Sequence, residues 1–219
     1  MPSFVFDLDG TLVDSVYQHV DAWRAAFQQL GYDCPAYRLH RKIGLTGTVL
    51  IKAVAQELHT QIPEEKAAEL EAIHAAEYNP KVSSLRPLPG ARDLLEWLHS
   101  RDIPFSIVTS SAKKEAQKLL SPLELDFKPP MLTREDLKKQ KPDPSGFIEG
   151  AKKIGARDVE TVVVGDSVWD VLAAVRARFL GVGVLTGGYG EEELAAAGAF
   201  RVYRDAGEML ERLNELGLE

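Results

Sequence analysis

Acidic, hydroxyl and basic side chains stand close behind several short apolar segments of this sequence, and together they could transfer a phosphoryl group. The set comprises Asp7, Asp9, Thr109, Ser110, Ser111, Lys141, Asp166 and Asp170. Four carboxylates in one site would repel one another, so such a site calls for a cation. Oxygen ligands without histidine or cysteine suit a hard ion, and we expect Mg²⁺.

The two aspartates of the first segment have the spacing of a nucleophile and a proton carrier. Asp7 and Asp9 are two residues apart, so in extended backbone their side chains point the same way. A carboxylate that attacks phosphorus forms an aspartyl-phosphate, while the second carboxylate handles protons. Lys141 offers a positive charge to the phosphoryl group and to the nucleophile.

Phosphate binding needs hydrogen-bond donors beside these groups. Thr109 and Ser110 offer hydroxyl and backbone N–H donors, and a helix expected from residue 112 adds its positive N-terminal end. We expect Gly10, in the same turn as Asp9, to contribute to phosphate binding. Asp166 completes the metal site, and Asp170, four residues later, lies beside it on the following helical turn.

These residues need a sheet that brings the ends of distant segments to one edge. Apolar segments predict strands at 3–8, 104–109, 130–133, 161–165, 180–185 and 200–203. Helical spacing predicts helices at 15–30, 45–59, 63–79, 90–101, 112–121, 145–155, 168–178, 191–198 and 206–216, the first with Ser15 as its N-cap. Alternating apolar strands and helices indicate a parallel sheet covered on both faces, whose ligands bind beyond the carboxyl ends of the strands.

The predicted fold class is α/β, a doubly wound parallel sheet with a Rossmann-like core and an all-helical insert after the first strand. Residues 15–85 contain no convincing strand, whereas the rest of the chain alternates. We therefore expect an α/β catalytic core at 1–15 and 83–219 and a helical domain at 16–82.

Composition excludes several classes of protein. The 219 residues hold 26 Lys and Arg against 33 Asp and Glu, and the net charge of −7 argues against a nucleic-acid binder. The one cysteine, Cys34, excludes an intrachain disulfide and fits a reducing compartment. No apolar run reaches the roughly 20 residues of a membrane helix, and the first apolar stretch carries two aspartates, unlike a signal peptide. We expect a cytoplasmic monomer or homodimer.

Four motifs, in order along the chain, carry a resemblance to a known family. They are Asp7-Leu-Asp-Gly-Thr-Leu-Val-Asp-Ser, Val108-Thr-Ser-Ser, Lys141-Pro-Asp-Pro and Gly165-Asp-Ser-Val-Trp-Asp170. The chain resembles the haloacid dehalogenase-like hydrolase superfamily over essentially its whole length. Within it, the chain is most similar to the phosphoglycolate phosphatase and β-phosphoglucomutase group.

The resemblance implies a role for each motif residue. Asp7 is the nucleophile, Asp9 the general acid and base, and Lys141 the charge stabiliser; Thr109 binds phosphate. The resemblance also implies that the metal touches Asp7, the backbone carbonyl of Asp9 and Asp166, with Asp170 in support. The helical insert then corresponds to the helical cap of the family.

The insert carries a candidate specificity loop, Lys42-Ile-Gly-Leu-Thr-Gly47. The resemblance implies that this loop selects the substrate, with Arg41, Thr46 and Gly47 as its contacts. His19 matches a histidine of the family's sugar mutases, but a histidine on a helix surface is also common, and its role stays open. The glycine-rich segment Leu185–Gly190 is expected to be structural.

These observations favour a Mg²⁺-dependent phosphatase of a small soluble phosphometabolite, of phosphoglycolate or sugar-phosphate type. The nearer alternative is a phosphosugar mutase that uses the same residues. A mutase needs a cation for the second phosphate of its substrate. The resemblance implies that β-phosphoglucomutases place an arginine of the loop there, and the matching position in this sequence is Gly47. Arg41 and Lys42 are close in sequence and could substitute. The distant alternative is a non-enzymatic phosphate-binding protein, which should have lost a catalytic carboxylate.

Overall fold

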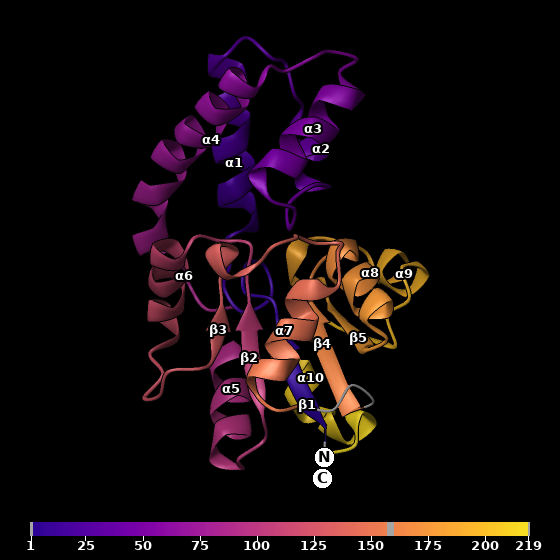
Figure 1. Ribbon diagram of the computed structural model, residues 1–219. Helices are drawn as coiled ribbons and strands as arrows, with labels where there is room; N and C mark the ends of the chain where they lie inside the picture. Colours follow the sequence, from indigo (N-terminus) through magenta and orange to yellow (C-terminus); the bar gives the residue numbers. More distant parts are fainter. Residues whose placement is uncertain (1, 157–159, 219) are drawn as a thin grey trace. The chain divides into compact units, whose positions relative to one another are not determined.

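The computed structural model describes residues 2–156 and 160–218, and the chain divides into two compact units. The core unit comprises Met1–Asp14 and Arg86–Glu219, and the helical unit comprises Ser15–Leu85. Figure 1 shows both, coloured along the chain. The predicted domain boundaries, at 15/16 and 82/83, lie within three residues of these divisions.

The core unit is built on one six-stranded sheet. Its strands are β1 (Ser3–Phe6), β2 (Phe105–Val108), β3 (Met131–Leu132), β4 (Thr161–Gly165), β5 (Leu180–Val184) and β6 (Arg201–Tyr203). The order is β3-β2-β1-β4-β5-β6, and every neighbouring pair is parallel. The predicted α/β fold with a parallel sheet is confirmed, and β1 lies at its centre.

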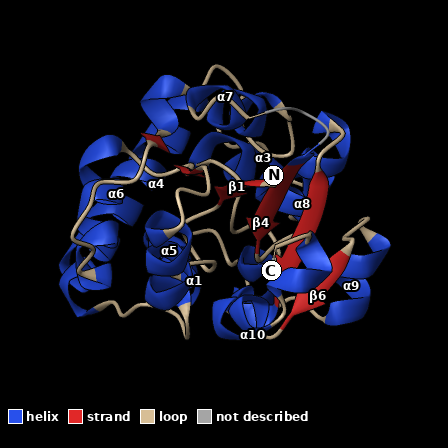
Figure 2. Ribbon diagram, turned by 90° about the horizontal axis from the view of Figure 1, so that it is seen from below, coloured by secondary structure: helices blue, strands red, loops and turns tan. Residues whose placement is uncertain are grey.

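Helices cover both faces of this sheet, with α7 and α8 on one side and α5 and α10 on the other (Figure 2). The helices are α5 (Ala91–Ser100), α6 (Lys113–Leu120), α7 (Ser145–Lys153), α8 (Val168–Ala177), α9 (Glu191–Ala196) and α10 (Ala206–Glu211). Short 3₁₀ turns occupy Ser121–Leu123, Arg134–Asp136, Leu185–Gly187 and Leu213–Leu216. The predicted single helix at 206–216 is wrong in its second half, because the chain tightens into the last of these turns.

The apolar strands form the core because alternate side chains enter opposite helix layers. Val5 of β1 and Val163 of β4 pack with Phe147 of α7 and with Ala173 and Ala174 of α8. All five side chains are essentially buried. This packing fixes the strand ends, and with them the turns that carry the polar residues.

The helical unit contains α1 (Val16–Gln29), α2 (Ala36–His40), α3 (Gly47–Glu57), α4 (Glu64–Tyr78) and a 3₁₀ turn at Asn79–Ser84. Its own apolar core includes Val20, Trp23, Phe27, Leu50 and Leu70. The short helix α2 was not predicted from the sequence.

Ser15 occupies the N-cap position of α1, as expected, but its side chain makes no capping hydrogen bond to the helix. No strand occurs among the residues of this unit, all of which are described.

The two chain segments that flank the helical unit are hydrogen-bonded to each other within the core unit. The backbone N–H of Asp14 donates to the carbonyl of Arg86 at 3.0 Å, and the N–H of Leu88 donates to the carbonyl of Leu12 at 3.0 Å. The outgoing and returning segments therefore pair with each other within the core unit. Throughout the described part of the chain, no helix combines the length and apolar character needed to cross a membrane.

Candidate active site

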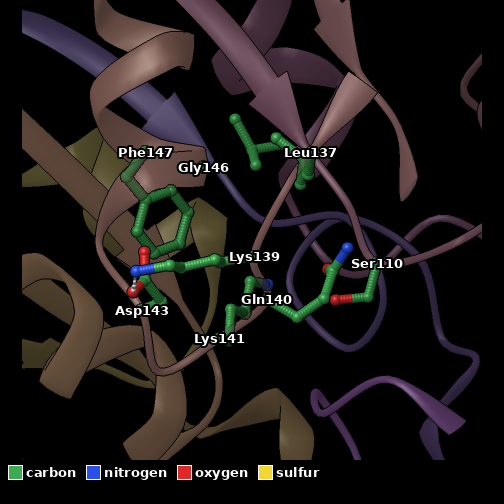
Figure 3. A pocket seen from close by; sticks show the side chains of 9 residues that line it. Ser110, Leu137, Lys139, Gln140, Lys141, Asp143, Gly146 and Phe147 are labelled. Carbon is green, nitrogen blue, oxygen red and sulfur yellow. Dashed lines mark ion pairs between the residues drawn. The ribbon is translucent and has the colours of Figure 1, made fainter. Parts of the chain in front are cut away.

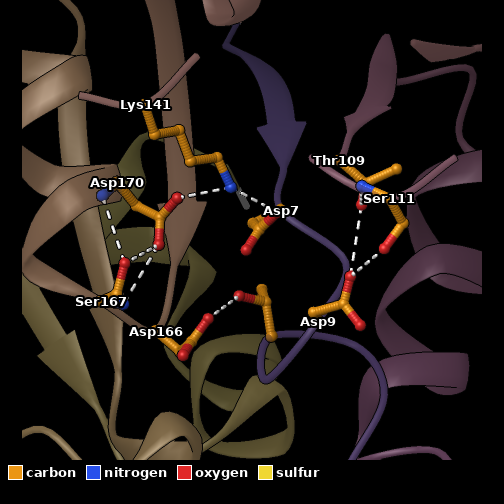
Figure 4. Close-up of polar contacts among 9 residues, drawn as sticks. Asp7, Asp9, Thr109, Ser111, Lys141, Asp166, Ser167 and Asp170 are labelled. Carbon is orange, nitrogen blue, oxygen red and sulfur yellow. Dashed lines mark hydrogen bonds and ion pairs between the residues drawn. The ribbon is translucent and has the colours of Figure 1, made fainter. Parts of the chain in front are cut away.

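Three aspartates form a buried cluster at the carboxyl ends of β1 and β4 (Figure 4). Asp7 follows β1, Asp166 follows β4, and Asp170 lies in the first turn of α8. One carboxylate oxygen from each lies within 4.8 Å of the others, and the three residues are at most 4% exposed. Strand ends that are neighbours in a parallel sheet bring these distant residues together.

Lys141 is the cation of this cluster. Its ammonium nitrogen lies 2.5 Å from Asp7 Oδ1 and 2.8 Å from Asp170 Oδ1, and the residue is 7% exposed. It stands in the loop before α7, followed by a cis peptide bond to Pro142. The predicted convergence of Lys141 with the aspartates is therefore seen in the structure.

The cluster carries more negative than positive charge. Burial raises the pKa of Asp7 to about 7; the ammonium of Lys141 opposes this rise, while the charge of Asp170 adds to it. Burial also raises the pKa of Asp166 well above its usual value, and the charges of Asp170 and Asp7 act in the same direction. One lysine does not balance three carboxylates, so a further cation fits the site.

The donor chemistry agrees with a hard cation. Asp7, Asp166 and Asp170 offer only carboxylate oxygens, the ligands that Mg²⁺ prefers. These three would hold the ion. Asp9, whose backbone carbonyl the resemblance implies as a metal ligand, contributes no carboxylate oxygen to this cluster.

Two glycines allow the aspartates to sit where they do. A side chain at Gly165 would collide with the carboxyl group of Asp170, and one at Gly187 would collide with that of Asp166. Hydrogen bonds then fix the orientation of the two carboxyl groups. Thr11 Oγ1 donates to Asp166 Oδ1 at 2.9 Å. Ser167 caps α8 and donates to Asp170 Oδ2.

Asp9 turns to a different set of partners. Its Oδ2 accepts from Ser111 Oγ at 3.0 Å and from Thr109 Oγ1 at 3.3 Å. The expectation that Asp7 and Asp9 point the same way assumed extended backbone through both residues. In the structure the two carboxylates bond to separate groups (Figure 4).

A small pocket lies beside Lys141 and receives the side chain of Ser110 (Figure 3). It is lined by Val108, Ser110, Leu137, Lys139, Gln140, Lys141, Asp143, Gly146 and Phe147. Ser110 is thus near the charged cluster, as expected. Thr109 is fully buried, and its hydroxyl donates to Asp9 in this structure. Gly10 uses its N–H within the turn, toward the carbonyl of Val13.

The family model of haloacid dehalogenase-like hydrolases matches residues 4–184. The chain belongs to the haloacid dehalogenase-like hydrolase family. The resemblance drawn from the four motifs is therefore confirmed.

Relatives of this hydrolase carry the names of phosphatases. Hexitol phosphatase A of Escherichia coli (strain K12) is 33% identical over 177 residues, which cover 80% of this chain and 78% of the relative. Phosphoglycolate phosphatase of Pseudomonas fluorescens (strain Pf0-1) is 30% identical over 191 residues, which cover 84% and 69%. The crystal structure of a hydrolase from Pseudomonas syringae is 44% identical, with a TM-score of 0.95 over 98% of this chain and 99% of that one.

The remaining candidate residues of this hydrolase lie in its helical unit. Arg41 is the C-cap of α2, Thr46 is the N-cap of α3, and Gly47 is the first residue of α3. A side chain at Gly47 would meet the flexible end of Glu71 on α4. Their role in specificity stays a prediction.

Lys42, beside them, is 5% exposed, and its ammonium nitrogen lies 2.5 Å from Glu57 Oε1. It also donates to the carbonyl of Arg38 at 3.3 Å. Lys42 is therefore held by partners within its own unit.

His19 lies among aromatic side chains of the helical unit. Its ring stacks on Tyr78 and His74, and its Nδ1 lies 3.1 Å from His74 Nε2. Trp23 also stacks on His74 and is buried. These contacts join α1 to α4, which gives His19 a packing role within this unit.

Several hydroxyl groups to which the sequence assigned no role bond to the site aspartates or to the turn at Gly10. Ser111 and Thr11 contact Asp9 and Asp166, and Thr186 Oγ1 donates to the carbonyl of Gly10 at 2.5 Å. Thr186 and Gly187 come from the glycine-rich segment expected to be structural. Thr186 bonds to the turn that contains Gly10, and Gly187 leaves room for the carboxyl group of Asp166. A signal for Ser111 existed, since it follows Thr109 and Ser110 directly behind an apolar strand.

Proposed function

We propose that this hydrolase is a Mg²⁺-dependent phosphatase of a small phosphometabolite and works through an aspartyl-phosphate on Asp7. The observation that carries the proposal is the separation of two aspartates into different surroundings. Asp7 lies in the charged cluster beside Lys141, whereas Asp9 lies among the hydroxyls of Thr109 and Ser111. Carboxylates in unlike surroundings suit unlike roles.

The chemistry follows from these positions. A carboxylate oxygen of Asp7 attacks phosphorus, the bond to the leaving oxygen breaks, and Asp9 gives that oxygen its proton. Water then attacks the aspartyl-phosphate and gives its proton to Asp9, which restores both aspartates. Lys141 neutralises negative charge on the phosphoryl oxygens, and Ser110 lines the adjacent pocket.

Asp7, Asp166 and Asp170 would hold Mg²⁺, which supplies positive charge for the phosphoryl oxygens. Thr11 and Ser167 keep two of these carboxylates oriented. In this proposal the helical unit is the cap, and Arg41, Thr46 and Gly47 select the leaving group. The names of the relatives, hexitol phosphatase and phosphoglycolate phosphatase, favour small phosphate esters of these two kinds as substrates.

The surroundings of Lys42 support hydrolysis over the mutase alternative. A mutase must hold the second phosphate of a bisphosphate, and Lys42 was one candidate cation for it. Lys42 is buried and paired with Glu57, and Gly47 has no side chain to offer. The complete set of carboxylates speaks against a non-enzymatic protein.

The test supplies β-glucose 1-phosphate with Mg²⁺ and a trace of glucose 1,6-bisphosphate, and measures glucose 6-phosphate and free phosphate. Parallel reactions contain a hexitol phosphate or phosphoglycolate. We expect phosphate release from at least one ester, equal to the alcohol formed, with no isomerised product. Rapid formation of glucose 6-phosphate with little free phosphate would replace the phosphatase by a mutase.

A further inference from the structure

The turn after β2 holds the carboxyl group of Asp9 through a closed set of hydrogen bonds (Figure 4). Ser111 Oγ and Thr109 Oγ1 both lie within bonding distance of the same oxygen, Asp9 Oδ2, at 3.0 and 3.3 Å. The N–H of Ser111 donates to Thr109 Oγ1 at 3.0 Å. Since the carboxyl oxygen Oδ2 only accepts, both hydroxyls direct their single hydrogens to it.

The backbone that carries these hydroxyls is itself anchored. The N–H of Thr109 donates to the carbonyl of Leu132, and the N–H of Arg134 donates to the carbonyl of Ser111, both at 3.0 Å. Thr109 is fully buried and Ser111 is 8% exposed. Strand β3 and the 3₁₀ turn after it therefore keep the two hydroxyls in place, and the hydroxyls in turn orient the carboxyl group of Asp9.

We propose that Ser111 is a positioning residue for the proton transfers of Asp9, a role that rests on the proposed phosphatase function. With Oδ2 held by two donors, Oδ1 is the oxygen that gives its proton to the leaving group. In the second half of the reaction Oδ1 takes the proton of the attacking water. The bonds to Oδ2 persist in both steps, because Oδ2 accepts whether or not Oδ1 carries the proton.

Ser111 has the shorter of the two bonds and is the better residue to test. Thr109 is also a candidate phosphate binder, so its variants would combine two effects. A positioned proton donor matters most when the leaving oxygen is strongly basic, because such an oxygen cannot depart as an anion. The effect of losing Ser111 should therefore depend on the leaving group.

The experiment compares two esters of the same shape, phenyl phosphate and 4-nitrophenyl phosphate, whose phenolates differ in basicity. With enzyme in excess, release of the phenol is measured in a single turnover, before the aspartyl-phosphate is hydrolysed. Ser111→Ala should slow release from phenyl phosphate by about 10-fold to 100-fold, a part of the 10²–10⁴ that general acid catalysis supplies. Release from 4-nitrophenyl phosphate should slow less than about threefold, and Ser111→Thr should behave as wild type.

Ser106→Ala is the matched control, because Ser106 is a buried serine on β2 whose hydroxyl donates to the carbonyl of Gly150 at 3.0 Å. Ser106→Ala should leave unchanged the ratio of the phenol-release rates from the two esters. Inhibition by inorganic phosphate should be the same in Ser111→Ala and wild type. If Ser111→Ala does not fold by circular dichroism, Ser111→Cys, a weaker donor of similar shape, should shift the ratio in the same direction.

Equal slowing of both esters, no slowing of either, or weaker phosphate inhibition in Ser111→Ala would overturn the positioning role. Failure of the proposed function is a different result. In that case the wild-type enzyme would release no phenol from either ester in the presence of Mg²⁺.

Discussion

Among the residues that the structure describes, each unit buries one lysine, and the two lysines differ in what surrounds them. Lys141 of the core unit and Lys42 of the helical unit are 7% and 5% exposed. Lys141 meets two buried carboxylates, Asp7 and Asp170, with Asp166 in the same cluster. The side chain of Glu57, the partner of Lys42, is 43% exposed. Burial of a charge therefore does not mark a reactive site, but an unbalanced excess of buried charge does.

The largest expected effect in this comparison comes from removing the nucleophile of the core unit. Asp7→Asn keeps the shape of the side chain but cannot attack phosphorus, so kcat should fall by more than about 10³-fold, on the order of 4 kcal/mol. Asp102→Asn is the control, since Asp102 is an exposed turn residue with a φ of 52°, which asparagine tolerates well. Steady-state phosphate release checks both, and activity of Asp7→Asn within tenfold of wild type contradicts the assignment.

The second expected effect tests the excess negative charge directly. EDTA should abolish activity and Mg²⁺ should restore it, because the three buried carboxylates cannot share their site as bare anions beside one lysine. Asp166→Ala should raise the Mg²⁺ concentration for half-maximal activity by about 10-fold to 100-fold, the range seen when a metal site loses support. Titration of activity with Mg²⁺ measures this, and an unchanged requirement removes Asp166 from the site.

A smaller effect is expected where the helical unit is proposed to select the substrate. Gly47→Arg should change the ratio of kcat/KM between a hexitol phosphate and phosphoglycolate by about 10-fold, since pocket contacts discriminate substrates by amounts of this order. Gly47→Ala is the control, because only the flexible end of Glu71 has to move for a methyl group. Equal changes for both substrates, or a change in melting temperature alone, would contradict the specificity role.

The smallest effect concerns the balanced pair of the helical unit. Lys42→Met should lower the free energy of unfolding by about 1–2 kcal/mol, less than the 3–5 kcal/mol of a fully buried pair, because water can solvate the half-exposed Glu57 that remains. Lys52→Met, on the exposed side of α3, should change it by less than about 0.5 kcal/mol. Urea denaturation measures the free energy of unfolding of both variants. A loss of about 3–5 kcal/mol in Lys42→Met would contradict the contrast drawn between the two lysines.

Much of the fold could be predicted from the sequence, because strands buried on both faces appear as continuous apolar runs between helical patterns. The exceptions are informative. The five-residue helix α2 has only Leu39 buried, so no apolar period marks it. Strand β1 stops at Phe6, two residues before the end of the predicted strand, and the turn that follows begins at Leu8, whose carbonyl accepts from the N–H groups of Thr11 and Leu12.

The charged residues of the site could be predicted as well, since Asp7, Lys141, Asp166 and Asp170 stand in motifs with fixed spacing. The hydroxyls that orient them could not. Ser111 and Asp9 are 102 residues apart, and Thr11 and Asp166 are 155 apart. Contacts over such separations are set by strand order, which local pattern does not reveal.

The pairing of the chain on either side of the helical unit has a consequence for how such proteins diversify. Asp14 bonds to Arg86 and Leu12 bonds to Leu88, so the two ends of the insert leave the core unit side by side. Joining two such close ends with a different segment changes the closure entropy only slowly with its length. The whole insert can therefore be exchanged as one module without altering the register of a single strand. Under the proposed role of the helical unit, such an exchange would bring new substrates to an unchanged set of reacting groups.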